Sequence, residues 1–424
     1  MKKINTSPIS GAQEFLPETQ AIFNQLKSQI ALVYRAHGFQ EIETPVIERT
    51  EILLAKAGGD TEKQIYKVIK TAESSDDADQ ALRFDHTVPL ARYVVEHEND
   101  LPFPFKVSQI GRNFRGERAQ KGRFREFYQC DVDIVGRNNL SLDYDAEVIA
   151  TVYEALSIFV NAGMVIRVSN RKILSGLLEA LELSEKAEAI FGIIDHAEKV
   201  PASVTEESLK NLGLSPEQKQ ILVSFMSIYG RYDEISEKLQ SFGITNELYQ
   251  QGVDELVKVL QVLGEHGIKN AIADMLIVRG LDYYTGTVFE TILPDYKEIG
   301  SVCSGGRYDN LASNYSNQSF PGVGGSIGLS RLFYILQEKN LIRPEILQTD
   351  KPVDLAVIPI SENERQLALE TAQKFRAEGK TVDVILTDKK LGDKLNYAAK
   401  FAKNSIVLGE EEAKTGNYEI KELS

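Results

Sequence analysis

The sequence predicts an α+β fold followed by a smaller α/β domain. Three observations lead to this prediction. Two alternating apolar runs, 105–111 and 127–136, flank a long polar loop, which is typical of an antiparallel hairpin. Residues 171–270 are rich in Leu, Ala, Glu and Lys and poor in glycine, which indicates an all-helical insertion. Beyond residue 353, strand-like and helix-like segments alternate, which predicts a largely parallel sheet.

The length of 424 residues allows roughly two to four domains, at about 100–200 residues each. We expect a main domain over residues 1–340, with the helical insertion at about 171–270. A linker is expected over 341–352, because two prolines interrupt the periodic pattern there. The final α/β domain is expected over 353–424.

The first elements follow from periodicity and from turn residues. Apolar side chains recur at helical spacing in 17–37, and Gly38 stands where that helix should end. The segment ETPVIE (43–48) is predicted to be a strand led in by Pro45. The polar residues 71–80 predict a loop, and 141–160 show helical periodicity.

The second half of the main domain returns to strand and turn patterns. Residues 276–293 and 301–311 indicate strands and turns, and 320–337 predict a glycine-rich turn that enters a helix. In the C-terminal domain the expected strands and helices are, in order, 354–360, a helix near 362–378, 381–386, a helix near 390–403, and 405–410.

Composition excludes several classes of protein. The net charge of −14 argues against a non-specific nucleic-acid coat, which would be basic. No apolar run approaches the roughly 18 residues of a membrane span, and the N-terminal stretch has no apolar core typical of a signal peptide. Two cysteines and five scattered histidines show no metal-ligand spacing, so no metal site is assigned to protein residues. We expect a cytoplasmic protein without a membrane segment.

A concentrated positive charge lies in the predicted hairpin loop. From Lys106 to Arg125 there are seven basic residues and one acid, Glu117, a local charge of +6. Guanidinium groups match phosphate oxygens bidentately, so such a loop suits one anionic ligand. The alternative is a solvated hairpin tip. The arginines of this loop are Arg112, Arg115, Arg118, Arg123 and Arg125.

Two further segments are candidates for a binding pocket. The run 279–284 places Arg279 before an acid and two tyrosines, although an ordinary strand with tyrosines in the core has the same pattern. Asp85 and Thr87 are two residues apart and would face the same way on a strand. Asp85 could then receive a cationic or hydrogen-bonding group of a ligand, and His86 between them would point away as a bystander.

The glycine-rich stretch 322–328 matches no nucleotide-binding motif. Ile327 occupies the last glycine position of GxGxxG, and no GK[ST] follows as a P-loop requires. Close backbone packing is the alternative role for these glycines. Arg331 follows on the predicted helix, where it could face a ligand or lie on the surface.

Taken together, these segments resemble the motifs of the histidyl-tRNA synthetases, a family of class II aminoacyl-tRNA synthetases. TPVIE resembles the motif 1 strand, and FRGERAQKGRFREFYQCDVDIVG resembles motif 2 with its loop. RGLDYYTGTVFE resembles a signature of the histidyl enzymes, and GSIGLSRL resembles motif 3. The C-terminal segment resembles the family's anticodon-binding domain. The motifs occur in the expected order over nearly the whole chain.

The resemblance implies a catalytic domain built on an antiparallel sheet with flanking helices, and a homodimer. It implies a histidine–tRNA ligase that activates histidine with ATP, releasing pyrophosphate, and then transfers histidine from histidyl-adenylate to the 3′ end of its tRNA. The ligands and partners are therefore L-histidine, ATP, Mg²⁺ bridging the ATP phosphates, and the tRNA for histidine.

The resemblance also implies roles for single residues. Arg115 would hold the α-phosphate and clamp it together with Arg279. Glu117 would contact the adenine amino group, and Phe127 and Arg331 would enclose the adenine ring. The residues expected to hold or line the site of histidine are Asp85, Thr87, Arg123, Gln129, Asp133, Arg279, Tyr283, Tyr284, Gly305, Gly306 and Arg307.

Other functions are compatible with the same fold. One relative of the fold regulates ATP phosphoribosyltransferase without catalysis, but it generally lacks the C-terminal domain and has an eroded motif 2. In this sequence the C-terminal segment and motif 2 are both present. A sensor of histidine or tRNA, or an unrelated α/β enzyme, is a further alternative.

Overall fold

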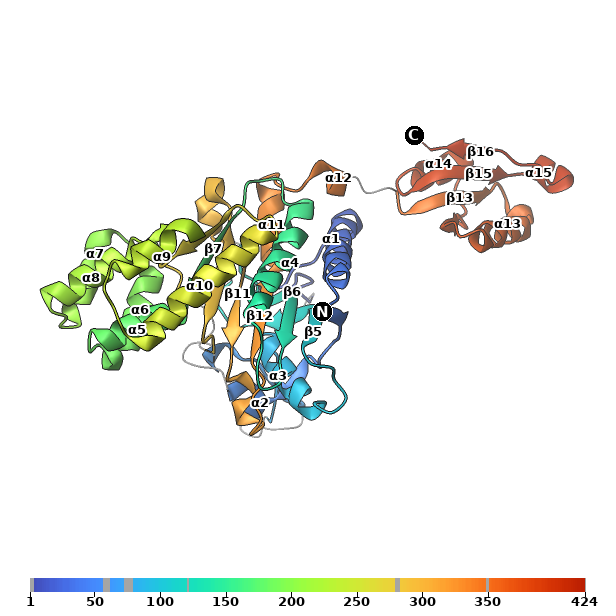
Figure 1. The fold of residues 1–424 in the computed structure, drawn as a ribbon. Coiled ribbons are helices and arrows are strands. Elements are labelled where there is room, and N and C mark those ends of the chain that lie inside the picture. Colours follow the sequence, from blue (N-terminus) through green and yellow to red (C-terminus); the bar gives the residue numbers. More distant parts are fainter. Residues whose placement is uncertain are drawn as a thin grey trace. The chain divides into compact units, whose positions relative to one another are not determined.

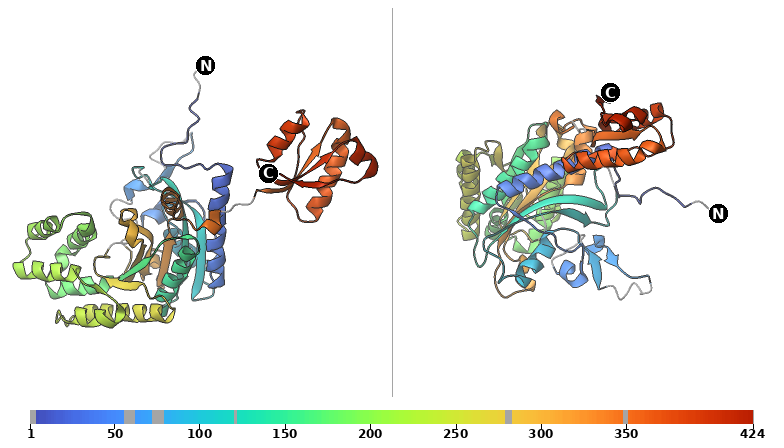
Figure 2. Two further views of the ribbon diagram at one scale, coloured as in Figure 1. Left: turned by 90° about the horizontal axis from the view of Figure 1, so that it is seen from above. Right: turned by 90° about the vertical axis from the view of Figure 1, so that its right-hand side faces the viewer.

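The computed structural model describes residues 4–55, 62–71, 79–119, 122–278, 283–347 and 351–423. The chain divides into two compact units, Met1–Arg343 and Pro344–Ser424. Figure 1 and Figure 2 show the elements of each unit.

The first unit is built on a nine-stranded sheet, counted over the described residues, in the order β1-β5-β6-β12-β11-β10-β7-β9-β8. Neighbours from β5 to β7 are antiparallel, whereas β1 joins β5 and β9 joins β7 in parallel. The prediction of an α+β fold on an antiparallel sheet is confirmed, with these two parallel pairs added. The strands are β1 (Gln40–Glu41), β5 (Phe105–Phe114), β6 (Glu126–Val135), β7 (Val165–Asn170), β8 (Tyr229–Gly230), β9 (Ala271–Asp274), β10 (Thr287–Ile292), β11 (Ser301–Tyr308) and β12 (Gly322–Ile327).

The predicted hairpin is formed by β5 and β6, paired from Phe105 with Val135 to Phe114 with Glu126. Side chains alternate between the two faces of a strand. In β6, Cys130, Val132 and Ile134 are fully buried apolar residues on one face. The polar side chains between them point to the opposite face, which leaves that face available for a site.

Helices α1 (Pro17–Ala36), α4 (Asp143–Phe159) and α10 (Glu247–Glu265) lie along one face of the sheet (Figure 1). The buried stripe of α1 includes Phe23, Leu26 and Ile30, at helical spacing. The chain turns away at Gly38, whose φ of +79° is a conformation that side chains disfavour. Helix α11 (Leu329–Glu338) packs against β6.

The predicted glycine-rich turn before α11 is wrong, because Gly322–Ile327 is strand β12 in the middle of the sheet. A Cβ at Gly324 would lie 2.1 Å from Oδ1 of Asp133, and one at Gly325 would lie 2.9 Å from the ring of Phe289. Side chains from β6, its neighbour, and from β10, two strands away, therefore lie over this strand. Its glycines leave room for them and hide the alternation by which a strand is recognised.

The segment after α1 forms a small three-stranded sheet in the order β2-β4-β3. Its strand β2 covers only the end of the predicted strand 43–48, and most of the predicted loop, 72–78, lies outside the described residues. The elements are β2 (Ile47–Arg49), α2 (Thr50–Leu54), β3 (Lys67–Val68) and β4 (Gln80–Leu82).

Helix α3 (Thr87–Glu96) begins at Thr87. The prediction that Asp85 and Thr87 share a strand is therefore wrong. Oδ1 of Asp85 accepts a 3.1 Å hydrogen bond from the backbone N–H of Val88, so its carboxylate satisfies one of the free donors of the first helical turn.

The segment between β7 and β9 is helical except for the two-residue strand β8. Its first helix packs against α10, and the others form a bundle at one end of the unit (Figure 1). These helices are α5 (Arg171–Ala180), α6 (Ala187–His196), α7 (Ala202–Asn211), α8 (Pro216–Met226) and α9 (Tyr232–Gln240).

The second unit holds a four-stranded sheet in the order β14-β13-β15-β16. The three predicted strands pair in parallel, as expected, whereas the antiparallel β16 was not predicted. Val357 and Ile358 in the central strand are fully buried on both faces, which is typical of a parallel strand. The elements are α12 (Pro344–Leu347), β13 (Val353–Pro359), α13 (Arg365–Ala377), β14 (Val382–Val384), α14 (Leu391–Ala398), β15 (Ala402–Leu408), α15 (Glu410–Thr415) and β16 (Ile420–Glu422).

No helix within the described residues has the length and apolar character needed to cross a membrane.

Candidate active site

A cavity of about 600 Å³ lies over the middle strands of the first unit. Its walls come from β6, β10, β11 and β12, from the hairpin loop, and from the starts of α3 and α11. Residues far apart in the sequence therefore meet in one place. The predicted site residues that line it are Asp85, Thr87, Arg115, Glu117, Arg123, Phe127, Gln129, Asp133, Tyr283, Tyr284, Gly305 and Arg331.

Strand β6 supplies a row of polar side chains to the cavity. Gln129, Asp131 and Asp133 are alternate residues, so they face the same side, and all three line the cavity. Gln129 and Asp133 were predicted as site residues, whereas Asp131 was not. The alternation of CDVD was the signal that could have found it.

Asp133 is held by Tyr308, whose hydroxyl donates a 2.8 Å hydrogen bond to Oδ1. Asp133 is almost fully buried. Burial, together with the neighbouring carboxylate of Asp131, raises the pKa of Asp133 to about 8. This carboxyl group is therefore mostly protonated at neutral pH, and it can donate as well as accept a hydrogen bond.

Arg307 is not brought into the cavity, in contrast to the expectation from the motif. Adjacent residues of a strand face opposite sides, and it is Tyr308 that lines the cavity. The guanidinium of Arg307 lies instead against α4, 2.7 Å from Oδ1 of Asp145, and donates to the carbonyl of Ser141 at 3.0 Å. Arg307 thus forms a buried ion pair between the sheet and α4.

Asp85 lies beside two tyrosines. The hydroxyl of Tyr283 lies 3.4 Å from Oδ2 of Asp85, and the rings of Tyr283 and Tyr284 meet edge-on at 5.1 Å. Burial raises the pKa of Asp85 to about 6, although the positive charge of Arg115 acts in the opposite direction. Burial also raises the pKa of both tyrosines, which keeps their hydroxyls protonated as donors.

The arginines of the hairpin loop fall into two groups. Arg115 faces the cavity, where its Nε donates to the carbonyl of Phe84 at 3.1 Å and its guanidinium lies 5.1 Å from the ring centroid of Phe127. Arg112 instead forms a 3.0 Å ion pair with Glu126, and its side chain is 53% exposed. The loop is therefore not a uniformly solvated tip.

The cavity wall also includes an aromatic ring and a second guanidinium. Phe127 and Arg331 both line it, and Arg331 donates to the carbonyl of Ile299 at 2.6 Å. Glu117 lies nearby, 3.5 Å from Arg123. A planar π-system between a ring and a guanidinium would be stabilised by stacking and by cation–π attraction.

Arg279, together with 280–282, lies outside the described residues. Other lining residues were missed by sequence analysis because they carry no local motif. Asp195 comes from α6 in the helical insertion and Glu290 from β10, so neither can be placed without the tertiary fold. Within the described residues, no group of three or more His, Cys, Asp or Glu side chains could hold a metal ion.

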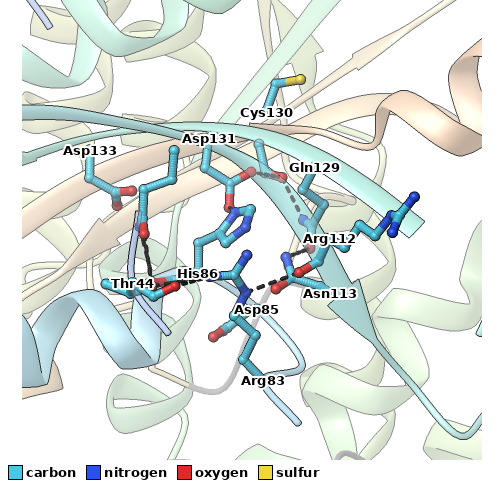
Figure 3. Close-up of polar contacts among 12 residues, drawn as sticks. Thr44, Arg83, Asp85, His86, Arg112, Asn113, Gln129, Cys130, Asp131 and Asp133 are labelled. Atoms are coloured by element: carbon cyan, nitrogen blue, oxygen red, sulfur yellow. Dashed lines mark hydrogen bonds and ion pairs between the residues drawn. The ribbon is translucent and has the colours of Figure 1, made fainter. Parts of the chain in front are cut away.

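Figure 3 shows two cavity-lining residues of β6, Gln129 and Asp131, beside His86 and Arg83, which do not line the cavity. The two buried cysteines, Cys130 and Cys303, are not disulfide-bonded.

Comparison with known proteins agrees with this geometry. The family model for histidyl-tRNA synthetase matches residues 11–332, and a model for an anticodon binding domain matches residues 354–424. A histidine–tRNA ligase from Clostridium tetani is 42% identical over all of this chain and 95% of its own length. One from Finegoldia magna is 41% identical, over 99% of this chain and 96% of its own.

Solved structures give the same result. The crystal structure of histidyl-tRNA synthetase from Nostoc sp. PCC 7120 superposes with a TM-score of 0.84 at 36% identity, over 99% of this chain and 95% of that chain. A Bacillus halodurans structure described as an ATP phosphoribosyltransferase regulatory subunit/histidyl-tRNA synthetase has a TM-score of 0.77 at 23% identity, over 96% of this chain and 99% of that chain, which shows a shared fold.

These matches define an aminoacyl-tRNA synthetase. More narrowly, the chain belongs to the histidyl-tRNA synthetase family, and the resemblance found in its motifs is confirmed.

Proposed function

We propose that this chain acts as a histidine–tRNA ligase, which forms histidyl-adenylate from histidine and ATP and then transfers histidine to the 3′ end of its tRNA. One observation carries this proposal: a single cavity combines the carboxyl groups of Asp85 and Asp133 with Arg115 and with the pair Phe127 and Arg331. The first set suits a cationic amino acid, and the second suits a nucleotide.

Histidine would occupy the floor above β6. Asp85 and Thr87 lie at the start of α3, where an ammonium group can be received by the carboxylate. The Asp133–Tyr308 pair offers a donor and an acceptor for an imidazole ring. An apolar amino acid of similar size would leave these buried polar groups unpaired, and the pocket would discriminate strongly against it.

ATP would bind along the hairpin loop. The adenine ring would lie between Phe127 and Arg331, with its amino group near Glu117, and Arg115 would contact the α-phosphate. A guanidinium suits this role because its fixed fork of donors matches phosphate oxygens. Mg²⁺ would enter with ATP, held chiefly by the phosphates, and would help to neutralise their charge.

The chemistry needs no side-chain nucleophile. The carboxylate of histidine attacks the α-phosphorus, the bond to the bridging oxygen breaks, and pyrophosphate leaves. In the second step a ribose hydroxyl of the tRNA attacks the acyl carbon, and AMP leaves. The protein positions the reactants and stabilises the charge that develops on the α-phosphate, a role assigned to Arg115 and, from its motif, to Arg279.

The remaining parts of the proposal concern organisation. Residues 1–340 would carry catalysis, with 341–352 as a linker, and residues 353–424 would bind the anticodon region of the tRNA. We expect a homodimer that works in the cytoplasm. The match of residues 354–424 to an anticodon binding domain model supports the assignment of the second unit.

The test is charging of tRNA with radiolabelled histidine by the purified full chain, with ATP and Mg²⁺. Acid-precipitable label that requires ATP and the tRNA for histidine is the expected result. Histidine binding without any charging would contradict the proposal and would favour a regulatory or sensor role.

A further inference from the structure

His86 lies between two residues of the cavity wall, but its own ring points behind the cavity floor. The side chain is fully buried. Its Nδ1 lies 2.9 Å from Oδ2 of Asp131, which lines the cavity (Figure 3). The other ring nitrogen, Nε2, is buried and has no hydrogen-bond partner within the described part of the chain. His86 thus contacts a cavity-lining residue through its ring, in contrast to the bystander role that was expected.

The backbone of His86 is also fixed. Its carbonyl accepts from the backbone N–H of Leu90 at 3.0 Å and from Nε2 of Gln109 at 3.3 Å. Gln109 pairs directly with Asp131 across β5 and β6, and its Oε1 accepts from Thr44 at 3.0 Å. The backbone of His86 is therefore fixed next to the strand pair that carries Asp131.

The surroundings of Nε2 indicate which ring nitrogen donates to Asp131. A Cβ at Gly111 would lie 3.1 Å from Nε2 of His86 and 2.6 Å from Nη2 of Arg83, so both groups border that residue. A guanidinium offers no acceptor. The charged groups near His86 are Arg83, Asp85 and Asp131. A proton on Nε2 would lack an acceptor, so the hydrogen bond at 2.9 Å is assigned to a proton on Nδ1 that is donated to Oδ2 of Asp131.

From Asp131 a chain of hydrogen bonds leads to Gln129. Oδ1 of Asp131 accepts a hydrogen bond from the hydroxyl of Ser326 at 2.5 Å. The hydroxyl oxygen of Ser326 in turn accepts from Nε2 of Gln129 at 2.6 Å. Oε1 of Gln129 accepts from Asn113 at 2.8 Å. The hydroxyl of Ser326 has one proton, so it donates to Asp131 and accepts from Gln129. The direction of each bond thus depends on Asp131 remaining an acceptor.

We infer that His86 is a positioning residue for histidine recognition. By donating from Nδ1 to Asp131, it holds that carboxylate in place and, through Ser326, fixes the orientation of the Gln129 amide in the cavity. This inference rests on the proposed function, since it assumes that histidine binds beside Gln129. His86 would therefore affect the affinity for histidine without touching the histidine molecule.

The test measures histidine binding by calorimetry, and the KM for histidine and for ATP in pyrophosphate exchange, for His86→Leu and His86→Asn in the full chain. Asparagine places an N–H donor near the position of Nδ1, whereas leucine has none. His86→Leu is expected to weaken histidine binding about tenfold and leave the KM for ATP unchanged, because a buried acceptor loses its donor. His86→Asn is expected to restore binding to within about threefold of the unmodified chain.

The matched control is His37→Leu. It removes a histidine–carboxylate contact of the same 2.9 Å length, to Glu154, outside the cavity, and it should leave histidine binding unchanged. If His86→Leu does not fold, Ser326→Ala tests the same series of hydrogen bonds with a smaller change. The same selective loss of histidine binding is expected.

Unchanged histidine binding by His86→Leu or Ser326→Ala would overturn the inference alone. So would equal losses in His86→Leu and His86→Asn, or an equal rise in the KM for ATP, because either would indicate a packing role. Absence of histidine binding by the unmodified chain would overturn the proposed function, and this inference with it.

Discussion

The hydroxyl of Tyr308 donates a 2.8 Å hydrogen bond to Oδ1 of Asp133, and the two residues come from β11 and β6, on either side of β12. The pair can form because Gly324 of β12 has no side chain, since a Cβ there would lie 2.1 Å from the same oxygen. A glycine in the central strand thus makes room for the polar pair to which we assign imidazole recognition.

Tyr308→Phe should weaken histidine binding about tenfold, because it removes the donor to a buried acceptor and disturbs the group that meets the imidazole. Calorimetric titration with histidine measures this effect. Tyr249→Phe is the control, since it removes a buried 2.7 Å tyrosine bond to the carbonyl of Leu239 in the helical insertion. Equal affinity in the unmodified chain and Tyr308→Phe would exclude the pair from the histidine site.

Asp133→Asn should stabilise the ligand-free protein increasingly as pH rises from 5 to 8. The pKa of Asp133 is raised to about 8, mainly by burial. Its stabilising contribution is present below the unfolded pKa near 4 and is lost as pH rises through 8, at up to about 1.4 kcal/mol per pH unit. Asparagine does not ionise. Thermal unfolding at several pH values measures the difference.

The control for that series is Asp143→Asn, which changes a carboxylate that is 59% exposed. Its effect on the unfolding temperature should not grow with pH in the same range. A constant difference between Asp133→Asn and the unmodified chain from pH 5 to 8 would contradict the account of Asp133.

Arg115→Ala should lower the rate of histidine-dependent pyrophosphate exchange about 10²–10³-fold, because it removes a preorganised donor to the reacting phosphate. Arg112→Ala is the matched control from the same hairpin, since Arg112 pairs with Glu126 and is half exposed. Comparable losses in both variants would mean that the loop acts only through its total charge.

Arg307→Met should destabilise the first unit by about 3–5 kcal/mol, because it leaves the buried carboxylate of Asp145 without its partner. The folded variant should bind histidine as the unmodified chain does. Thermal unfolding and calorimetry separate the two effects. A variant that melts normally but binds histidine tenfold more weakly would return Arg307 to the site.

Much of the fold could be predicted from the sequence where local pattern and final structure agree. Apolar and polar residues alternate along the hairpin, a glycine with positive φ follows the end of α1, and the C-terminal strands are short apolar runs between helices. Strand β12 was not predicted because its glycines make room for side chains of other strands, so its own sequence shows no alternation of apolar and polar residues. Its pattern reflects the side chains of Asp133 and Phe289, which belong to other strands.

The site residues that could be predicted from the sequence are those that lie within a recognisable motif. Motif and cavity agree for Arg115, but they differ for Arg307, because the motif does not reveal which face of β11 each residue occupies. Tyr308 and Asp131 could be assigned to the cavity only once the pairing of the strands was known. Asp195 required the insertion to be packed against the catalytic sheet, which no local pattern indicates.

The most direct test of the central claim is ATP–pyrophosphate exchange by the purified full chain with Mg²⁺, assayed with histidine and with each other amino acid in turn. The account predicts exchange with histidine alone, because the buried polar groups around Asp133 would be left unpaired by apolar side chains. Exchange with another amino acid at a similar rate, or no exchange while histidine still binds, would contradict it.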